Sequence, residues 1–253
     1  MKNILIYGAG AIGRGYLAPL LQNHGIKISF VDNDNKLVNE LKSRKSYKAA
    51  ITGDNDYHFV NVPIHNVFLF GEKVNLEEYD LVFCCVGPNN CYDLAEDLKY
   101  AKAVISCEND MGTVKGLRDL TGNENIYFGI PDVITSNTAP NKLLLDDPLT
   151  TVTEQGLLVI EKGNYNLPDD IIQIDLDELH MHWMCKLFIH NAPHAIAAYL
   201  GWLKGYTFIH EAMADEDINR IVVGSISEIT DGVVAAGFAE KNYAEEYKQK
   251  EYK

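Results

Sequence analysis

The chain has 253 residues, of which 47% are hydrophobic, and a formal net charge of −14. So acidic a chain would repel nucleic-acid phosphates, and an anionic substrate would need a local cluster of positive charge. No apolar stretch approaches the ~20 residues of a membrane span, and the five cysteines show no zinc-knuckle or disulfide-frame spacing. We therefore expect a cytoplasmic protein with reduced thiols that binds neither nucleic acid nor membrane.

Buried apolar strands alternate with helical segments in the first half of the chain. Strands are predicted at residues 3–7, 27–31, 81–86, 103–107 and 126–130, and helices from the glycines at 8–13 to about residue 24 and at 35–44. Residues 47–51 and 57–62 flank a Gly-Asp-Asn-Asp turn and predict a hairpin. Strands that alternate with helices indicate parallel βαβ units.

The motif G-x-G-x-x-G at Gly8, Gly10 and Gly13 lies between the first strand and the first helix. In a dinucleotide-binding loop the first glycine allows a tight turn, the second lets backbone approach the pyrophosphate, and the third packs helix on strand. Free N–H groups of the first helical turn, which includes Ile12, would face the anion. Asp32 ends the second strand and is expected to accept from the adenosine ribose hydroxyls, which favours NAD over NADP. The alternative is a glycine-rich turn that binds no dinucleotide.

Two more strand ends are expected near the cofactor, because ligands of open α/β sheets lie beyond the carboxyl ends of the strands. Gly87 follows the third of these strands and would lie beside the cofactor. Asn109 follows the fourth and can offer an N–H to an oxygen in the site, or can instead cap the helix that starts near Gly112. Arg14 can help to neutralise the pyrophosphate, or can be an exposed side chain of the first helical turn.

The pattern changes near residues 146–148. Residues 151–160 are strand-like, and from about residue 175 the chain is helical. We predict an α/β fold in which a Rossmann-type doubly wound sheet, residues 1–175, is followed by an all-helical substrate domain, residues 176–253. Residues 240–253 are mostly charged residues and tyrosine, and predict a solvated helix or a frayed tail.

The helical part contains Lys-Leu-Phe-Ile-His-Asn-Ala-Pro-His at residues 186–194. At about 100° per residue from Lys186, His194 falls near ~80° and Asn191 near ~140°, so an amine, an amide and an imidazole share one face. This set suits the interconversion of a carbinol and a carbonyl, since a lysine can move the proton while the amide and the imidazole hold the oxygen. The alternative is a structural helix in which the lysine reaches solvent and the histidine is satisfied in the core.

Two other features of this helix have local consequences. Pro193 has no N–H for the Ile189 carbonyl and is expected to kink the helix. His190 and His194 are four residues apart, as in a zinc-binding pair. No carboxylate or cysteine completes a ligand set at a convincing spacing, so no metal is expected.

Together these motifs resemble those of the polyol-specific long-chain dehydrogenases, over essentially the whole chain. The matching stretches are G-A-G-A-I-G-R-G at 8–15, C-E-N at 107–109, D-P-L at 147–149, Lys-x4-Asn-x2-His-Ala from 186, and A-Y-L-G-W-L-K-G at 198–205. The resemblance implies a Rossmann domain, a helical substrate domain and an active site between them. It also implies metal-independent hydride transfer between NAD and mannitol 1-phosphate, which gives fructose 6-phosphate.

The resemblance also implies roles for individual residues. Lys186 would be the general base, which near neutral pH requires a pKa lowered by a desolvated setting. Asn191, with Asn109, would hydrogen-bond the oxygen as it gains alkoxide character, and His194 would position a substrate hydroxyl.

Besides Pro193 within the helix, the sequence departs from the family pattern in two ways. The family continues with a further helical portion whose arginine-rich element is associated with substrate phosphate, whereas this chain has four arginines. We therefore expect an incomplete helical domain, whose exposed apolar surface would favour self-association. The family's Asp-Arg-Ile is here Asp132-Val133-Ile134.

Two alternatives to this function remain open. One is a related dehydrogenase for an unphosphorylated polyol or a hexuronate, and the other is an NAD-binding protein without turnover.

Overall fold

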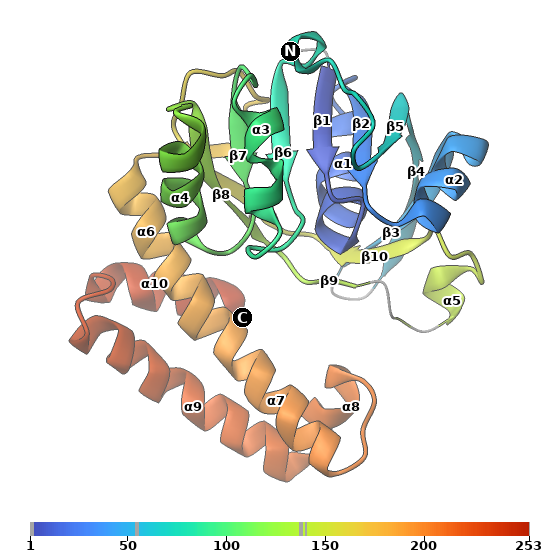
Figure 1. Cartoon of the computed structure of the whole chain (residues 1–253). Coiled ribbons are helices and arrows are strands. Elements are labelled where there is room, and N and C mark those ends of the chain that lie inside the picture. The colour runs from blue at the N-terminus through green and yellow to red at the C-terminus, as the bar shows by residue number, and fades with distance from the viewer. Residues whose placement is uncertain (1–2, 54–55, 137–138, 140, 253) are drawn as a thin grey trace. The chain divides into compact units, whose positions relative to one another are not determined.

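The computed structural model describes residues 3–53, 56–136, 139 and 141–252 (Figure 1). The chain forms two compact units, Met1–Ile174 and Asp175–Lys253. The division into a cofactor domain and a catalytic domain, predicted near this point, stays a prediction about function.

An eight-stranded sheet forms the centre of the first unit, with the order β12-β11-β8-β7-β6-β1-β2-β5. Its strands are β1 (Asn3–Tyr7), β2 (Lys27–Asp32), β5 (Asn66–Leu69), β6 (Leu81–Cys84), β7 (Val104–Ser106), β8 (Ile126–Asp132), β11 (Leu157–Glu161) and β12 (Ile172–Ile174). Six neighbouring strands of this sheet are parallel, namely β5, β2, β1, β6, β7 and β8. They follow the doubly wound order 3-2-1-4-5-6. The predicted α/β sheet is therefore confirmed.

The central strands are apolar along their whole length because helices cover both faces of such a sheet. Ile4, Leu5 and Phe83 are 0% exposed. Helix α4 (Met111–Thr121) packs against β8, and α1 (Ala18–Gln22) packs against β2. Figure 1 shows α4 and the short α3 (Ala95–Leu98) in front of the sheet.

A second, four-stranded sheet has the order β4-β3-β10-β9. The predicted hairpin is confirmed as β3 (Ser46–Thr52) and β4 (Tyr57–Pro63), and β10 (Thr151–Glu154) and β9 (Thr135–Ser136) extend it. The strand-like run at residues 151–160 forms two strands, of which β10 belongs to this sheet and β11 to the large one. The chain changes sheet at Gly156, where a Cβ would lie 2.5 Å from the Asp132 carbonyl oxygen.

The remaining helices of the first unit are short, apart from α2. They are the π-helical η1 (Ala11–Leu17), α2 (Asn35–Arg44), the 3-10 turns η2 (Leu76–Glu78) and η3 (Cys91–Leu94), and α5 (Asn141–Leu144). Helix α2 has its predicted bounds because Asp34 caps it, accepting from the N–H groups of Lys36 and Leu37 at 2.8 and 3.2 Å.

The second unit is helical, as predicted. It consists of α6 (Leu176–Cys185), the π-helical turn η4 (Lys186–Asn191), α7 (Ala192–Leu203), α8 (Ile209–Met213), α9 (Glu216–Ala235) and α10 (Lys241–Glu251). Helix α7 packs on α8 and α9, and α10 packs on α9 and η4. None of the helices in the described part of the chain is long and apolar enough to cross a membrane.

The last helix differs from the solvated or frayed segment that its composition predicts. Ala244 is 0% exposed and Tyr247 is 5% exposed, and both pack with Cys185, Ile189 and Val233 in one apolar cluster. Composition alone did not predict this packing, because two residues on one face are enough to hold an otherwise charged helix against its neighbours.

Candidate functional site

The glycine loop follows β1, and its three glycines serve different purposes. Gly8 has φ +93°, and a Cβ there would lie 2.2 Å from the Cys85 carbonyl oxygen. A Cβ on Gly13 would lie 2.0 Å from the Gly8 oxygen and 2.9 Å from Ile6. A Cβ on Gly10 would meet nothing within 4 Å. Gly8 and Gly13 are thus required by packing, whereas Gly10 leaves open space where a ligand can approach the backbone.

The carboxylate of Asp32 ties the end of β2 to this loop. Its Oδ2 accepts from the Ala9 N–H at 2.7 Å, and its Oδ1 accepts from the Asp34 N–H at 2.9 Å. These bonds fix the position of the side chain at the rim of the pocket described next.

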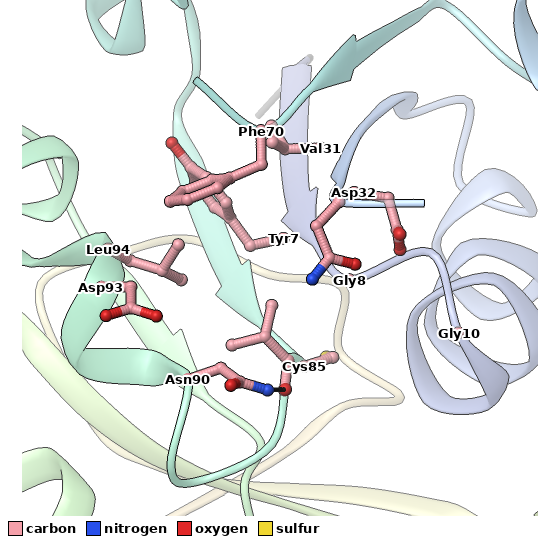
Figure 2. Close-up of a pocket in the computed structure, with 12 residues that line it drawn as sticks. Tyr7, Gly8, Gly10, Val31, Asp32, Phe70, Cys85, Asn90, Asp93 and Leu94 are labelled. Carbon is pink, nitrogen blue, oxygen red and sulfur yellow. Dashed lines mark hydrogen bonds between the residues drawn. The ribbon is translucent and has the colours of Figure 1, made fainter. Parts of the chain in front are cut away.

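A pocket of about 220 Å³ opens beyond the carboxyl ends of β1, β2 and β6. Figure 2 shows Gly8, Gly10 and Asp32 on one side of it, with Asn90, Asp93 and Leu94 on the other. Its lining comprises Tyr7, Gly8, Gly10, Val31, Asp32, Asn33, Phe70, Cys85, Val86, Asn90, Asp93 and Leu94.

Three of the six predicted cofactor residues, Gly8, Gly10 and Asp32, line this pocket. Ile12 packs its side chain on the core, so its backbone alone is left for a ligand. Gly13 packs the helix, and Gly87 lies in the turn after β6.

Sequence reasoning missed the wall formed by Phe70, Asn90, Asp93 and Leu94. Asn90 could have been predicted from the sequence, because it comes two residues after Gly-Pro at the end of an apolar strand. Its Nδ2 donates to the Val86 carbonyl at 2.7 Å. Phe70 could not have been predicted from the sequence, because its position depends on the pairing of β5 with β2.

Glu108, the middle residue of the C-E-N motif, holds the turn after β6. Its two carboxylate oxygens accept from the N–H groups of Val86 and Gly87 at 2.6 and 2.8 Å. Burial raises the pKa of Glu108, although the bonds from Cys91, Val86 and Gly87 oppose that rise. Glu108 therefore fixes the wall of the pocket from a neighbouring strand.

The sequence left two possible roles open for Asn109 and two for Arg14. The alternative role of Asn109 as a helix cap is wrong, because Asp110 caps α4 by accepting from the Gly112 N–H at 3.0 Å. Asn109 is exposed and has φ +54°, a conformation that asparagine tolerates better than most residues.

Arg14 is 4% exposed, so the expectation of an exposed side chain is wrong. Its Nε donates to the Ala9 carbonyl at 3.0 Å, its Nη1 donates to the Leu149 carbonyl, and its guanidinium lies over the Tyr47 ring. Burial lowers the pKa of Arg14. The side chain thus braces the loop from behind.

The second group of predicted residues lies in the π-helical turn η4, which holds Lys186 and Asn191, and in the first turn of α7, which holds His194. Lys186 is 4% exposed, which rules out the alternative in which it reaches solvent. Asn191 and His194 are half-buried. The disruption expected at Pro193 takes the form of this π-helical turn, which ends just before the first turn of α7.

The hydrogen bonding of His194 defines its tautomer. Its Nδ1 lies 2.8 Å from the His190 carbonyl oxygen, which can only accept. Nδ1 therefore carries a proton, and in the neutral imidazole Nε2 is the acceptor. The rings of His190 and His194 stack with centroids 4.7 Å apart. Among the described residues no group of three or more His, Cys, Asp or Glu side chains is arranged to hold a metal ion.

The strand order, the glycine loop and the acid at the end of β2 define the class: a Rossmann-type α/β fold, here with a helical C-terminal unit. The family models specify it further. Residues 2–200 match the mannitol dehydrogenase Rossmann domain, and residues 178–251 match the mannitol dehydrogenase C-terminal domain. The chain belongs to the mannitol dehydrogenase family.

Curated relatives agree with this family. The chain is 30% identical to the mannitol-1-phosphate 5-dehydrogenase of Caldanaerobacter subterraneus subsp. tengcongensis, over 91% of the chain and 66% of that protein. It is 31% identical to the enzyme of the same name from Thermoanaerobacter pseudethanolicus, over 88% of the chain and 64% of that protein. The chain thus spans slightly less than two thirds of the length of these relatives.

Solved structures support the fold. A D-mandelate dehydrogenase superposes with a TM-score of 0.68 at 15% identity, covering 100% of this chain and 80% of that one. The 2-dehydropantoate 2-reductase of Geobacter metallireducens GS-15 gives a TM-score of 0.59 at 17% identity, covering 99% and 84%.

Proposed function

We propose that this chain takes part in the NAD-dependent oxidation of mannitol 1-phosphate to fructose 6-phosphate, with Lys186 as the general base. The observation that carries the proposal is the burial of Lys186 in a continuous helical segment with Asn191 and His194, in a chain of the mannitol dehydrogenase family. Lysine is rarely this deeply buried in a folded protein, so the burial of Lys186 suits a chemical role.

The pocket of the first unit carries groups that suit the pyrophosphate and a ribose of NAD. The open space at Gly10 and the N-terminus of η1 suit a pyrophosphate. Asp32, already fixed by the Ala9 N–H, suits the ribose hydroxyls and would repel a 2′-phosphate. The backbones of Gly8, Gly10, Ile12, Gly13 and Gly87 would complete the cofactor site. NAD, when bound, supplies the acceptor for the hydride.

The residues of the second set manage the substrate's oxygen atoms. Lys186, in its neutral form, would take the proton of the reacting hydroxyl, so that the O–H bond breaks while the C=O bond forms. The amides of Asn191 and Asn109 would donate to that oxygen as its negative charge develops. His194 would accept a second substrate hydroxyl at Nε2, because its Nδ1–H is engaged by the His190 carbonyl.

The test is an NAD-reduction assay with mannitol 1-phosphate and, separately, mannitol, on the wild type and Lys186→Ala. The expected result is turnover of the phosphate ester, and a kcat that falls by about 10²–10⁴ in the variant while NADH binding is unchanged. Lys241→Ala, which removes an exposed lysine of α10, is the matched control.

Three outcomes would contradict the proposal. Equal rates for wild type and Lys186→Ala would remove Lys186 from the mechanism. NADH binding without turnover of any polyol would favour the non-catalytic alternative, and equal use of mannitol and its phosphate would favour the unphosphorylated substrate.

A further inference from the structure

The carbonyl of Ile189 lies within the turn that carries the candidate catalytic residues. In a regular α-helix it would accept from the N–H four residues later, but that residue is Pro193, which has none. Ile189 is 0% exposed, so solvent does not supply a donor. A buried carbonyl that has lost its α-helical donor is stabilised by a hydrogen bond from another group.

The donor is the hydroxyl of Tyr252, whose Oη lies 2.7 Å from the Ile189 oxygen. Tyr252 directly follows α10 and is 63 residues away in the sequence. The bond thus joins the end of the last helix to the middle of η4.

The same helix contacts α6 through two other tyrosines. The Tyr243 hydroxyl lies 3.2 Å from Nδ1 of His182, and the Tyr247 ring lies 5.4 Å from the ring of the same histidine. With Ala244 buried beside them, α10 is anchored without the Tyr252 hydroxyl. Loss of that hydroxyl would therefore leave the helix in place and affect the carbonyl alone.

We propose that Tyr252 is a positioning residue, whose hydroxyl replaces the N–H missing at Pro193 and holds η4 in the shape that presents Lys186, Asn191 and His194. The catalytic consequence rests on the function proposed above, whereas the structural consequence does not. Without the hydroxyl, the buried Ile189 carbonyl would seek another donor, and the turn would change shape to provide one.

The first variant for the test is Tyr252→Phe, which keeps the ring and removes the donor. A displaced base loses activity steeply, so kcat is expected to fall about ten- to a hundredfold, with little change in the KM for NAD. Hydrogen exchange of the amides at residues 190–192 and 194 is expected to become faster. Tyr199→Phe makes the same chemical change at a side chain that is 73% exposed, and is expected to alter neither measurement.

The second variant adds Pro193→Ala to Tyr252→Phe. Alanine at 193 supplies a backbone N–H that can donate to the Ile189 carbonyl, so both kcat and exchange protection are expected to recover towards wild type. A structural role unrelated to this carbonyl predicts no recovery, and that result would overturn the proposal. It would equally be overturned if Tyr252→Phe kept a kcat within twofold of wild type and unchanged exchange.

The two proposals fail in different ways. If the wild type oxidises no polyol, the proposed function fails, and hydrogen exchange alone decides the role of Tyr252. Faster exchange in Tyr252→Phe with recovery in the double variant would support the contact, and unchanged exchange would reject it.

Discussion

The glycine loop after β1 and the π-helical turn η4 each present candidate functional groups, but they are built differently. In the loop, Gly8 and Gly13 are required because a Cβ at either position would collide with a neighbouring backbone oxygen. In the turn, the carbonyl that Pro193 leaves without its usual donor is satisfied by Tyr252, 63 residues further on. A motif of the first kind can be read from a short sequence, whereas the geometry of the second depends on a distant helix.

The largest expected effect is a difference in stability between alanine variants of two glycines of the loop. Gly8→Ala combines φ +93° with a Cβ 2.2 Å from a carbonyl oxygen, and is expected to lower the free energy of unfolding of the first unit by about 3–5 kcal/mol. Gly10→Ala meets nothing within 4 Å, and is expected to leave stability nearly unchanged while it weakens NADH binding. Urea unfolding and NADH titration measure the two effects. A Gly8→Ala variant as stable as wild type would show that this account of the loop is wrong.

A smaller effect is expected at Glu108. A glutamine offers one acceptor where the carboxylate has two, so Glu108→Gln leaves the N–H of Val86 or Gly87 without its acceptor and is expected to lose about 1–2 kcal/mol. Glu124→Gln, at an exposed glutamate, is the control.

The pH dependence at Glu108 has a definite sign. Burial raises the pKa of Glu108 in the folded chain, so the folded state binds the proton more tightly than the unfolded state. Its contribution to stability is therefore greatest below the ordinary pKa and declines as the pH rises through the raised pKa. The difference in unfolding free energy between wild type and Glu108→Gln should shrink over that interval, and a difference that grows with pH would contradict this assignment.

The smallest effect on stability is expected on the outer face of α7. Tyr199, Trp202 and Leu203 are 73%, 74% and 72% exposed, and self-association of the helical unit stays a prediction. Trp202→Ser is expected to change the free energy of unfolding by less than about 0.5 kcal/mol but to reduce association in sedimentation velocity. Wild type that remains monomeric at high concentration would remove the prediction.

Local patterns were enough for most of the first unit. The apolar runs predicted β1, β2, β6, β7 and β8, and the glycines with Asp32 predicted one side of the pocket. They were not enough for the other side, since Phe70 and Leu94 reach the pocket only through strand pairing and the turn after β6. The strand-like run after residue 150 was divided between two sheets because Gly156 lies against the Asp132 backbone.

The sequence by itself determined the α/β order, the dinucleotide-type loop and the helical character of the segment that carries Lys186, because each rests on spacing within about 25 residues. Tertiary structure alone decided that Arg14 is buried behind the loop, that Glu108 holds a neighbouring turn, and that α10 docks and places Tyr252 at Ile189. The physical reason is that a hydrogen bond between distant segments depends on how the whole chain packs, and no local period encodes that packing.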